Sequence, residues 1–199
     1  MKIEFDEYGR SMIEMLGVLA IVGVLSVAGI AGYSKAMGRF KINKTIDQVS
    51  SISSGIKSYF VSEGTYAAIA TTPSKSIYKV GLFPEDMTKA CASADSVTDN
   101  ASTCIQNAVN GKAYIISNNR TFCIAFTGLS SEACSTLASS DWGTSTGYKG
   151  LLIVNNGANL TCGTHDLVPT SSAEAVISAT ETKCKCPAET GCSIAWEFF

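Results

Sequence analysis

The sequence has little of what most catalytic and metal sites require. It contains one histidine, His165, among 199 residues, which argues against histidine-based catalysis or a His-rich metal site. Its 15 basic and 17 acidic residues nearly balance, so charge gives no support for nucleic-acid binding. No Gly-x-Ser-x-Gly, phosphate-loop or His-Glu-x-x-His motif is present. We therefore predict a protein that is not an enzyme and needs no cofactor.

Hydrophobic residues make up 46% of the chain, which excludes a disordered or collagen-like protein. Cysteine is absent before residue 91 and frequent afterwards. The eight cysteines are Cys91, Cys104, Cys123, Cys134, Cys162, Cys184, Cys186 and Cys192. Because the Cys-x-x-Cys spacing of zinc sites is missing, this pattern predicts disulfides in an oxidising compartment. A metal held by the last three of these residues is the alternative.

Eight cysteines allow 105 pairings, so the connectivity does not follow from the sequence. We expect cysteines close in sequence to pair, and the last four to pair among themselves. The expected bridges are Cys91–Cys104, Cys123–Cys134, and either Cys186–Cys192 or Cys184–Cys192.

A long uncharged segment lies near the N-terminus, from Met15 to Tyr33. As a helix it spans about 28 Å, close to the hydrocarbon thickness of a bilayer. It is longer than the apolar part of a secretory signal, and Met1–Arg10 is not the basic start that such a signal needs. The segment is therefore predicted to be a membrane span.

The helix is expected to continue beyond the span. After Tyr33, apolar residues recur at steps of three and four, the spacing of one helix face. We predict one helix from about Ser11 to Glu63, roughly 80 Å long, ending at Gly64. Its first half is apolar all round and its second half is amphipathic.

Two signals conflict over which side of the membrane carries the C-terminal part. By the positive-inside rule, the basic residues after the span would place that part in the cytoplasm. These residues are Lys35, Arg39, Lys41 and Lys44. The cysteines favour an oxidising compartment instead, and we give them the greater weight.

The segment Gly9-Arg10-Ser11-Met12-Ile13-Glu14-Met15-Leu16, followed by the apolar run, resembles the N-terminus of type IV pilins and pseudopilins. Gly9 matches the last leader residue, and Glu14 matches the glutamate that is fifth after the scissile bond. The resemblance implies cleavage between Gly9 and Arg10 by a prepilin peptidase on the cytoplasmic face, and N-methylation of Arg10. It also implies an inner-membrane precursor that an assembly platform builds into an extracellular pilus.

A physical argument that does not depend on the resemblance also suggests a role for Glu14. A carboxylate at the start of a membrane span is costly and normally needs a partner. After cleavage, the new amine of Arg10 is near in the same chain, or a neighbouring copy supplies it. Such a pair fixes register more than it adds stability. Alternatively, Glu14 lies at the headgroup interface without a specific role.

Without Met1–Gly9, the remaining charges are unevenly distributed along the chain. The part from Arg10 to Phe60 then carries a net charge of +4, and the part from Val61 to Phe199 carries −4. Basic stems and acidic heads suit packing between copies. In the other interpretation, the basic residues lie at a lipid headgroup surface.

The rest of the chain has an α+β pattern with no internal repeat. We predict a long N-terminal α-helix packed on a small antiparallel β-sheet head with disulfides. The predicted strands are Ala113–Ser117, Thr121–Phe126, Lys149–Val154 and Cys192–Phe198, the first two joined as a hairpin. The predicted short helices are Pro84–Cys91, Asn100–Val109, Ser130–Leu137 and one capped by Ser171.

These expectations give four regions. They are a leader (1–9), a transmembrane or filament-core helix (10–33), the amphipathic half of that helix (34–63) and a disulfide-rich head (64–199). The predicted function is that of a pilin, a subunit of a homo-oligomeric helical filament that contacts membrane lipid before assembly and binds no nucleic acid. The alternatives are a minor pilin acting as an adhesin, a type II secretion pseudopilin, and a plain membrane-anchored ectodomain.

Overall fold

The computed structural model describes residues 12–99, 103–143, 147–155 and 160–199. It separates into two compact units. The first ends at Phe40 and holds the N-terminal part of helix α1. The second, Lys41–Phe199, holds the rest of α1 and every other helix and strand described, and is called the head below.

Helix α1 runs from Met12 to Phe60. The helix predicted over about Ser11 to Glu63 is thus confirmed, although Ser11 lies outside the described residues and Val61–Glu63 form a turn. Gly64 ends the helix as predicted. Its N–H donates to the carbonyl of Phe60 at 3.3 Å, and its φ of 62° is a left-handed conformation that favours glycine.

The head contains one four-stranded antiparallel sheet, in the order β1-β2-β4-β3. The strands are β1 (Ala113–Asn118), β2 (Thr121–Leu129), β3 (Tyr148–Val154) and β4 (Cys192–Phe198). All four predicted strands and the predicted hairpin are confirmed. The Asn118 side chain organises the hairpin turn, because its Oδ1 accepts hydrogen bonds from the backbone N–H groups of Arg120 and Thr121.

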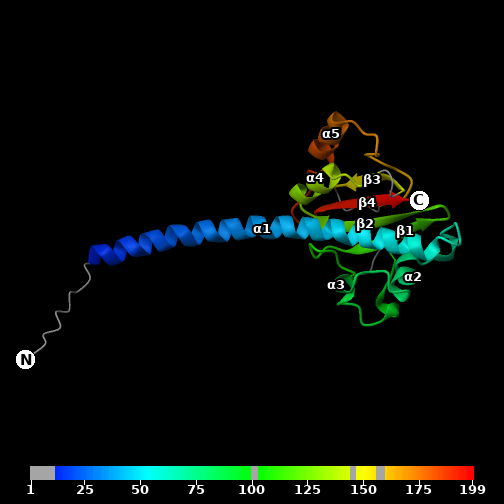
Figure 1. Ribbon diagram of the computed structural model, residues 1–199, viewed down its shortest axis with the longest axis horizontal. Coiled ribbons are helices and arrows are strands. Elements are labelled where there is room, and N and C mark those ends of the chain that lie inside the picture. Colours follow the sequence, from blue (N-terminus) through cyan, green and yellow to red (C-terminus); the bar gives the residue numbers. More distant parts are fainter. Residues whose placement is uncertain (1–11, 100–102, 144–146, 156–159) are drawn as a thin grey trace, which may run out of the picture. The chain divides into compact units, whose positions relative to one another are not determined.

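One face of the sheet forms the main core with the C-terminal half of α1 (Figure 1). Val49, Ile52 and Ile56 of α1 are fully buried there, in the same cluster as Phe122 and Trp196. The opposite face, here called the outer face, carries a smaller cluster formed by Tyr114, Cys123, Ala125, Leu160 and Ala195. Both faces are therefore covered, which explains why β4 is an almost continuous apolar run.

Short helices flank the sheet (Figure 1). They are η1 (Ala67–Ile69), α2 (Pro73–Lys79), α3 (Glu85–Thr88), η2 (Ala94–Ser96), α4 (Ser131–Ser139) and α5 (Ala173–Lys183). The predicted helices at Pro84–Cys91 and Ser130–Leu137 appear as α3 and α4. The helix after residue 171 is also present, but its N-cap is Ser172, whose hydroxyl accepts from the N–H of Ala175.

The helix predicted over Asn100–Val109 is wrong where the structure describes it, from residue 103 on. Asn107 competes with helix formation there. Its Oδ1 accepts from the N–H groups of Val109 and Gly111, and its Nδ2 donates to the carbonyl of Thr127. The side chain thus holds a turn that leads into β1.

Candidate functional site

The N-terminal part of α1 is an apolar surface. Met12 is 84% exposed and Ile30 is 68% exposed. The most apolar stretch of the helix has a mean hydropathy of 2.3, and none of it is buried. By length and composition, α1 is the one helix of the described chain that can cross a membrane. Such a surface needs lipid or other protein around it.

Glu14 lies in the first turn of α1 and is exposed. It is the only charged residue between Met12 and Tyr33. A negative charge at this end of a helix is favoured by the helix dipole. Gly9 and Arg10 lie outside the described residues, so cleavage between them and methylation of Arg10 stay predictions.

Gln48 anchors α1 within the head. It is buried, its Nε2 donates to Asp86 Oδ2 at 2.9 Å, and its Oε1 accepts from the N–H of Ala108 at 3.0 Å. Lys44, one turn earlier, forms an ion pair of 2.7 Å with the same Asp86 oxygen. Burial raises the pKa of Asp86, but the hydrogen bonds from Lys44 and Gln48 outweigh it and hold the pKa below its usual value.

Glu197 places a charge on the outer face of the sheet, where its side chain is 2% exposed. Its Oε1 pairs with Lys149 Nζ at 2.9 Å. Its Oε2 lies 2.8 Å from His165 Nε2 and accepts from the N–H of Gly163 at 2.7 Å. The carboxylate therefore ties β4 to β3 and to the segment 160–167.

The partners of Glu197 keep it ionised. Burial raises the pKa of its carboxyl, but hydrogen bonds from Lys149, Thr121 and the N–H of Gly163 together lower the pKa below its usual value. A buried charge with this many partners is held in one position, and losing one partner leaves the charge poorly compensated.

All eight cysteines form disulfides, namely Cys91–Cys104, Cys123–Cys162, Cys134–Cys184 and Cys186–Cys192. The predicted Cys91–Cys104 bridge is confirmed, as is Cys186–Cys192, one of the two alternatives. Cysteines 184, 186 and 192 therefore offer no thiolates to a metal.

The predicted Cys123–Cys134 bridge is wrong, and so is the expectation that the last four cysteines pair among themselves. Cys123 points to the outer face of β2, whereas Cys134 on α4 belongs to the main core on the other side of the sheet. Cys123 bonds Cys162 on its own face, and Cys134 bonds Cys184 at the end of α5.

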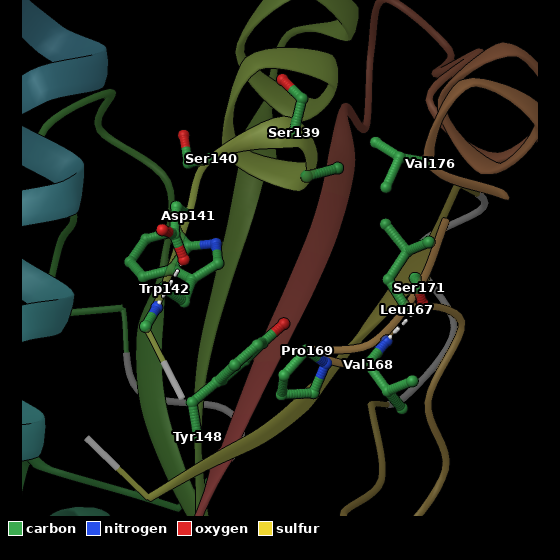
Figure 2. A pocket seen from close by; sticks show the side chains of 12 residues that line it. Ser139, Ser140, Asp141, Trp142, Tyr148, Leu167, Val168, Pro169, Ser171 and Val176 are labelled. Atoms are coloured by element: carbon green, nitrogen blue, oxygen red, sulfur yellow. Dashed lines mark hydrogen bonds between the residues drawn. The ribbon is translucent and has the colours of Figure 1, made fainter. Parts of the chain in front are cut away.

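A small cavity of about 140 Å³ lies between α4, α5 and the start of β3. Figure 2 shows the rings of Trp142 and Tyr148 along one side of it and Val176 on the other. Trp142 Nε1 donates to the carbonyl of Leu137 at 3.0 Å, and burial raises the pKa of Tyr148. The cavity is well below the 300–1,000 Å³ of typical ligand pockets.

A family model described as Bundlin matches residues 35–198, most of the chain. The chain belongs to the bundlin family. These are type IV pilin domains, so the resemblance inferred from the N-terminal residues is confirmed at the level of the family. No curated protein matches the chain.

Membership of the bundlin family implies a pilin-like structural subunit that assembles into pilus-type oligomers, and it points away from an enzyme. A long apolar N-terminal helix fits a membrane-anchored precursor of an extracellular pilin. The match begins at residue 35, so the roles of Gly9, Arg10 and Glu14 rest on the sequence pattern.

Sequence reasoning missed the structural roles of Gln48 and Glu197 in this bundlin-family head. Gln48 lies on the predicted helix, but the polar side chain gives no sign of burial. Glu197 interrupts an apolar strand, and this interruption was the available signal. A buried charged residue in such a strand needs partners, and the single histidine is one of them.

Proposed function

We propose that the chain is a structural subunit of a type IV pilus-like filament. Residues 1–9 are the leader, 10–33 the span and later the filament core, 34–63 the amphipathic half of the helix, and 64–199 the disulfide-rich remainder of the head, which the filament exposes. A prepilin peptidase cuts between Gly9 and Arg10 on the cytoplasmic side of the inner membrane, and the amine of Arg10 is methylated. The assembly platform then moves subunits from the bilayer into the filament.

The observation that carries this proposal is the exposed apolar part of α1, joined to a head that has its own complete core. The head needs α1 only from about Ile42 onward, the first α1 residue buried in its core. The helix before it presents large apolar side chains on all sides, which suits lipid first and other copies of the same helix afterwards.

Glu14 sets the register between copies in this mechanism. In a bundle of such helices its carboxylate meets the terminal amine of Arg10 from a neighbouring copy. One charge pair in an apolar surrounding strongly disfavours arrangements that leave either charge unpaired. The basic residues Lys35 and Arg39 lie at lipid headgroups before assembly and near acidic heads afterwards.

The test is the intact mass of the protein from its native membrane or filaments, before and after reduction. The expected mass is that of Arg10–Phe199 plus one methyl group, less eight hydrogens for four disulfides. Gly9→Leu should retain the leader, whereas Lys2→Ala, also in the leader, should be cut as before.

A mass that retains Met1–Gly9, with all thiols free, would overturn the proposal and leave a plain anchored protein. The number of copies in purified filaments distinguishes a major pilin from a minor pilin or adhesin. A major pilin dominates purified filaments, whereas a minor pilin or adhesin is present at a few copies.

A further inference from the structure

Two disulfides meet where α4, α5 and β4 come together. Cys134–Cys184 joins α4 to the end of α5, and Cys186–Cys192 closes the loop into β4. The Sγ atoms of Cys134, Cys186 and Cys192 lie within 4.8 Å of one another. A sulfur of one bridge therefore lies beside both sulfurs of the other. We call these four residues the four-cysteine cluster.

The cluster has one sulfur-bearing residue that solvent reaches. Cys134 and Cys192 are fully buried and Cys184 is 2% exposed, whereas Cys186 is half-buried. Cys186 also lines a surface cavity of about 390 Å³, formed with Ser131 and the loop 187–191. A thiol that approaches from solvent therefore meets Cys186 first.

We propose that Cys186 is the point of attack for a partner of the thiol–disulfide oxidoreductase class, and that the four-cysteine cluster then exchanges its pairing. The partner's thiolate attacks Cys186 Sγ, the Cys186–Cys192 bond breaks, and Cys192 leaves as a thiolate. Cys192 then attacks Cys134 Sγ and displaces Cys184 as a thiolate. Cys184 attacks Cys186 in the mixed disulfide and returns the partner's thiolate.

The exchange consumes no oxidant or reductant. Two disulfides, Cys134–Cys184 and Cys186–Cys192, become two others, Cys134–Cys192 and Cys184–Cys186, and the partner's thiol is regenerated. Only the disulfide pairing within the head changes.

The new disulfide pairing releases the C-terminal end of α5 from α4. No residue of α5 is buried, and only Val176 and Ala179 pack partly against the core. Cys134–Cys184 is the covalent bond that holds its C-terminal end to α4. After exchange, Cys134 is bonded to β4 instead, and α5 keeps a local bridge that no longer ties it to α4. The cluster thus has a pairing that fixes α5 and a pairing that frees it.

The first test uses the full processed chain in detergent, incubated with and without a small amount of reduced glutathione and then quenched with acid and an alkylating reagent. Trypsin and a glutamate-specific protease separate the cysteines, because Lys185 lies between Cys184 and Cys186 and Glu189 lies before Cys192. Glu132 likewise separates Cys123 from Cys134.

The expected result is that peptides joined through Cys134–Cys192 and Cys184–Cys186 appear only with glutathione, at an unchanged intact mass. Glutathione adducts trapped early should lie on the Cys186 peptide, and amides of α5 should exchange faster with deuterium. Cys91–Cys104 and Cys123–Cys162 should stay unchanged. The proposal is overturned if the original pairings alone persist at equilibrium, or if all eight cysteines scramble together.

A second test removes the two cysteines on the α5 side. In Cys184→Ser/Cys186→Ser, Cys134 and Cys192 should form a disulfide in oxidising glutathione buffer. The matched control, Cys104→Ser/Cys162→Ser, leaves Cys91 and Cys123 unpaired in different clusters, and both should stay alkylatable. Two free thiols in a folded Cys184→Ser/Cys186→Ser variant would overturn the proposal. If that variant does not fold, the glutathione experiment on the unmodified chain decides.

Discussion

The amide of Gln48 and the carboxylate of Asp86 join across 38 residues of chain by a hydrogen bond of 2.9 Å. The same amide group accepts from the N–H of Ala108 through its oxygen. One buried side chain of α1 therefore holds both the helix α3 and the segment leading to β1. The hydrophobic contacts of α1 fix its depth in the head, and Gln48 adds a directional restraint along the helix.

Replacing this side chain should weaken the head. Gln48→Ala is expected to lower the free energy of unfolding by about 2–3 kcal/mol, because it removes two hydrogen bonds and leaves the N–H of Ala108 without its partner. The control Asn43→Ala changes an exposed polar residue of the same helix and should stay within about 0.5 kcal/mol. Denaturant unfolding followed by the fluorescence of Trp142 and Trp196 measures both. Equal effects of the two substitutions would contradict the anchoring role.

Glu197 should make stability depend on pH on the acid side. Its folded pKa lies below its unfolded value, which is about 4.3. Its contribution is therefore complete above the unfolded pKa and is lost as the pH falls through the folded pKa. Glu197→Gln should cost about 2–3 kcal/mol at pH 7 and show a flatter decline below pH 5. Unfolding midpoints at pH 7, 5 and 3.5 measure this, and parallel declines in the two proteins would count against it.

The disulfides should differ in how much they stabilise the head. Cys123→Ala/Cys162→Ala opens a bridge with a sequence separation of 39 and should cost about 4 kcal/mol. Cys91→Ala/Cys104→Ala opens one with a separation of 13 and should cost about 3 kcal/mol. Denaturation of both variants under non-reducing conditions gives the comparison. The opposite ranking would mean that local packing, and not loop closure, dominates.

Neutralising Glu14 should impair assembly but not the head. We expect Glu14→Gln to yield membrane-held, leader-free subunits and at least tenfold fewer sheared filaments, because the terminal amine loses its partner in the apolar bundle. Ser26→Ala is the matched control in the same apolar stretch. Its hydroxyl donates to the carbonyl of Val22 in its own helix, so filament yield should not change. Normal filament yield in Glu14→Gln would contradict the proposed role of Glu14 in setting the register between copies.

Local patterns predicted much of this fold. The steps of three and four after Tyr33 predicted the amphipathic half of α1, and the Asn118–Arg120 turn between β-branched and aromatic runs predicted the hairpin of β1 and β2. These signals lie within a few residues of the structure that they specify.

The errors concern relationships between distant segments. The Cys123–Cys134 expectation rested on closeness in sequence alone, but the alternation of β2 turns Cys123 to the outer face. The helix expected over Asn100–Val109 had suitable residues, yet Asn107 bonds the backbone of a turn and the carbonyl of Thr127. Similarly, Glu197 and His165 come together only because segment 160–167 crosses the sheet.

The position of β4 sets the order in which the molecule can be completed. This strand is buried along its whole length and lies between β2 and β3, so neither neighbour has its full set of backbone partners without it. A ribosome that has made residues 1–191 has made a helix ready for the membrane and a head that cannot close. The apolar helix is therefore complete early in synthesis, while folding of the head waits until residues 192–198 have been made. A chain that stops before that point leaves the edges of β2 and β3 without the backbone partners that β4 provides.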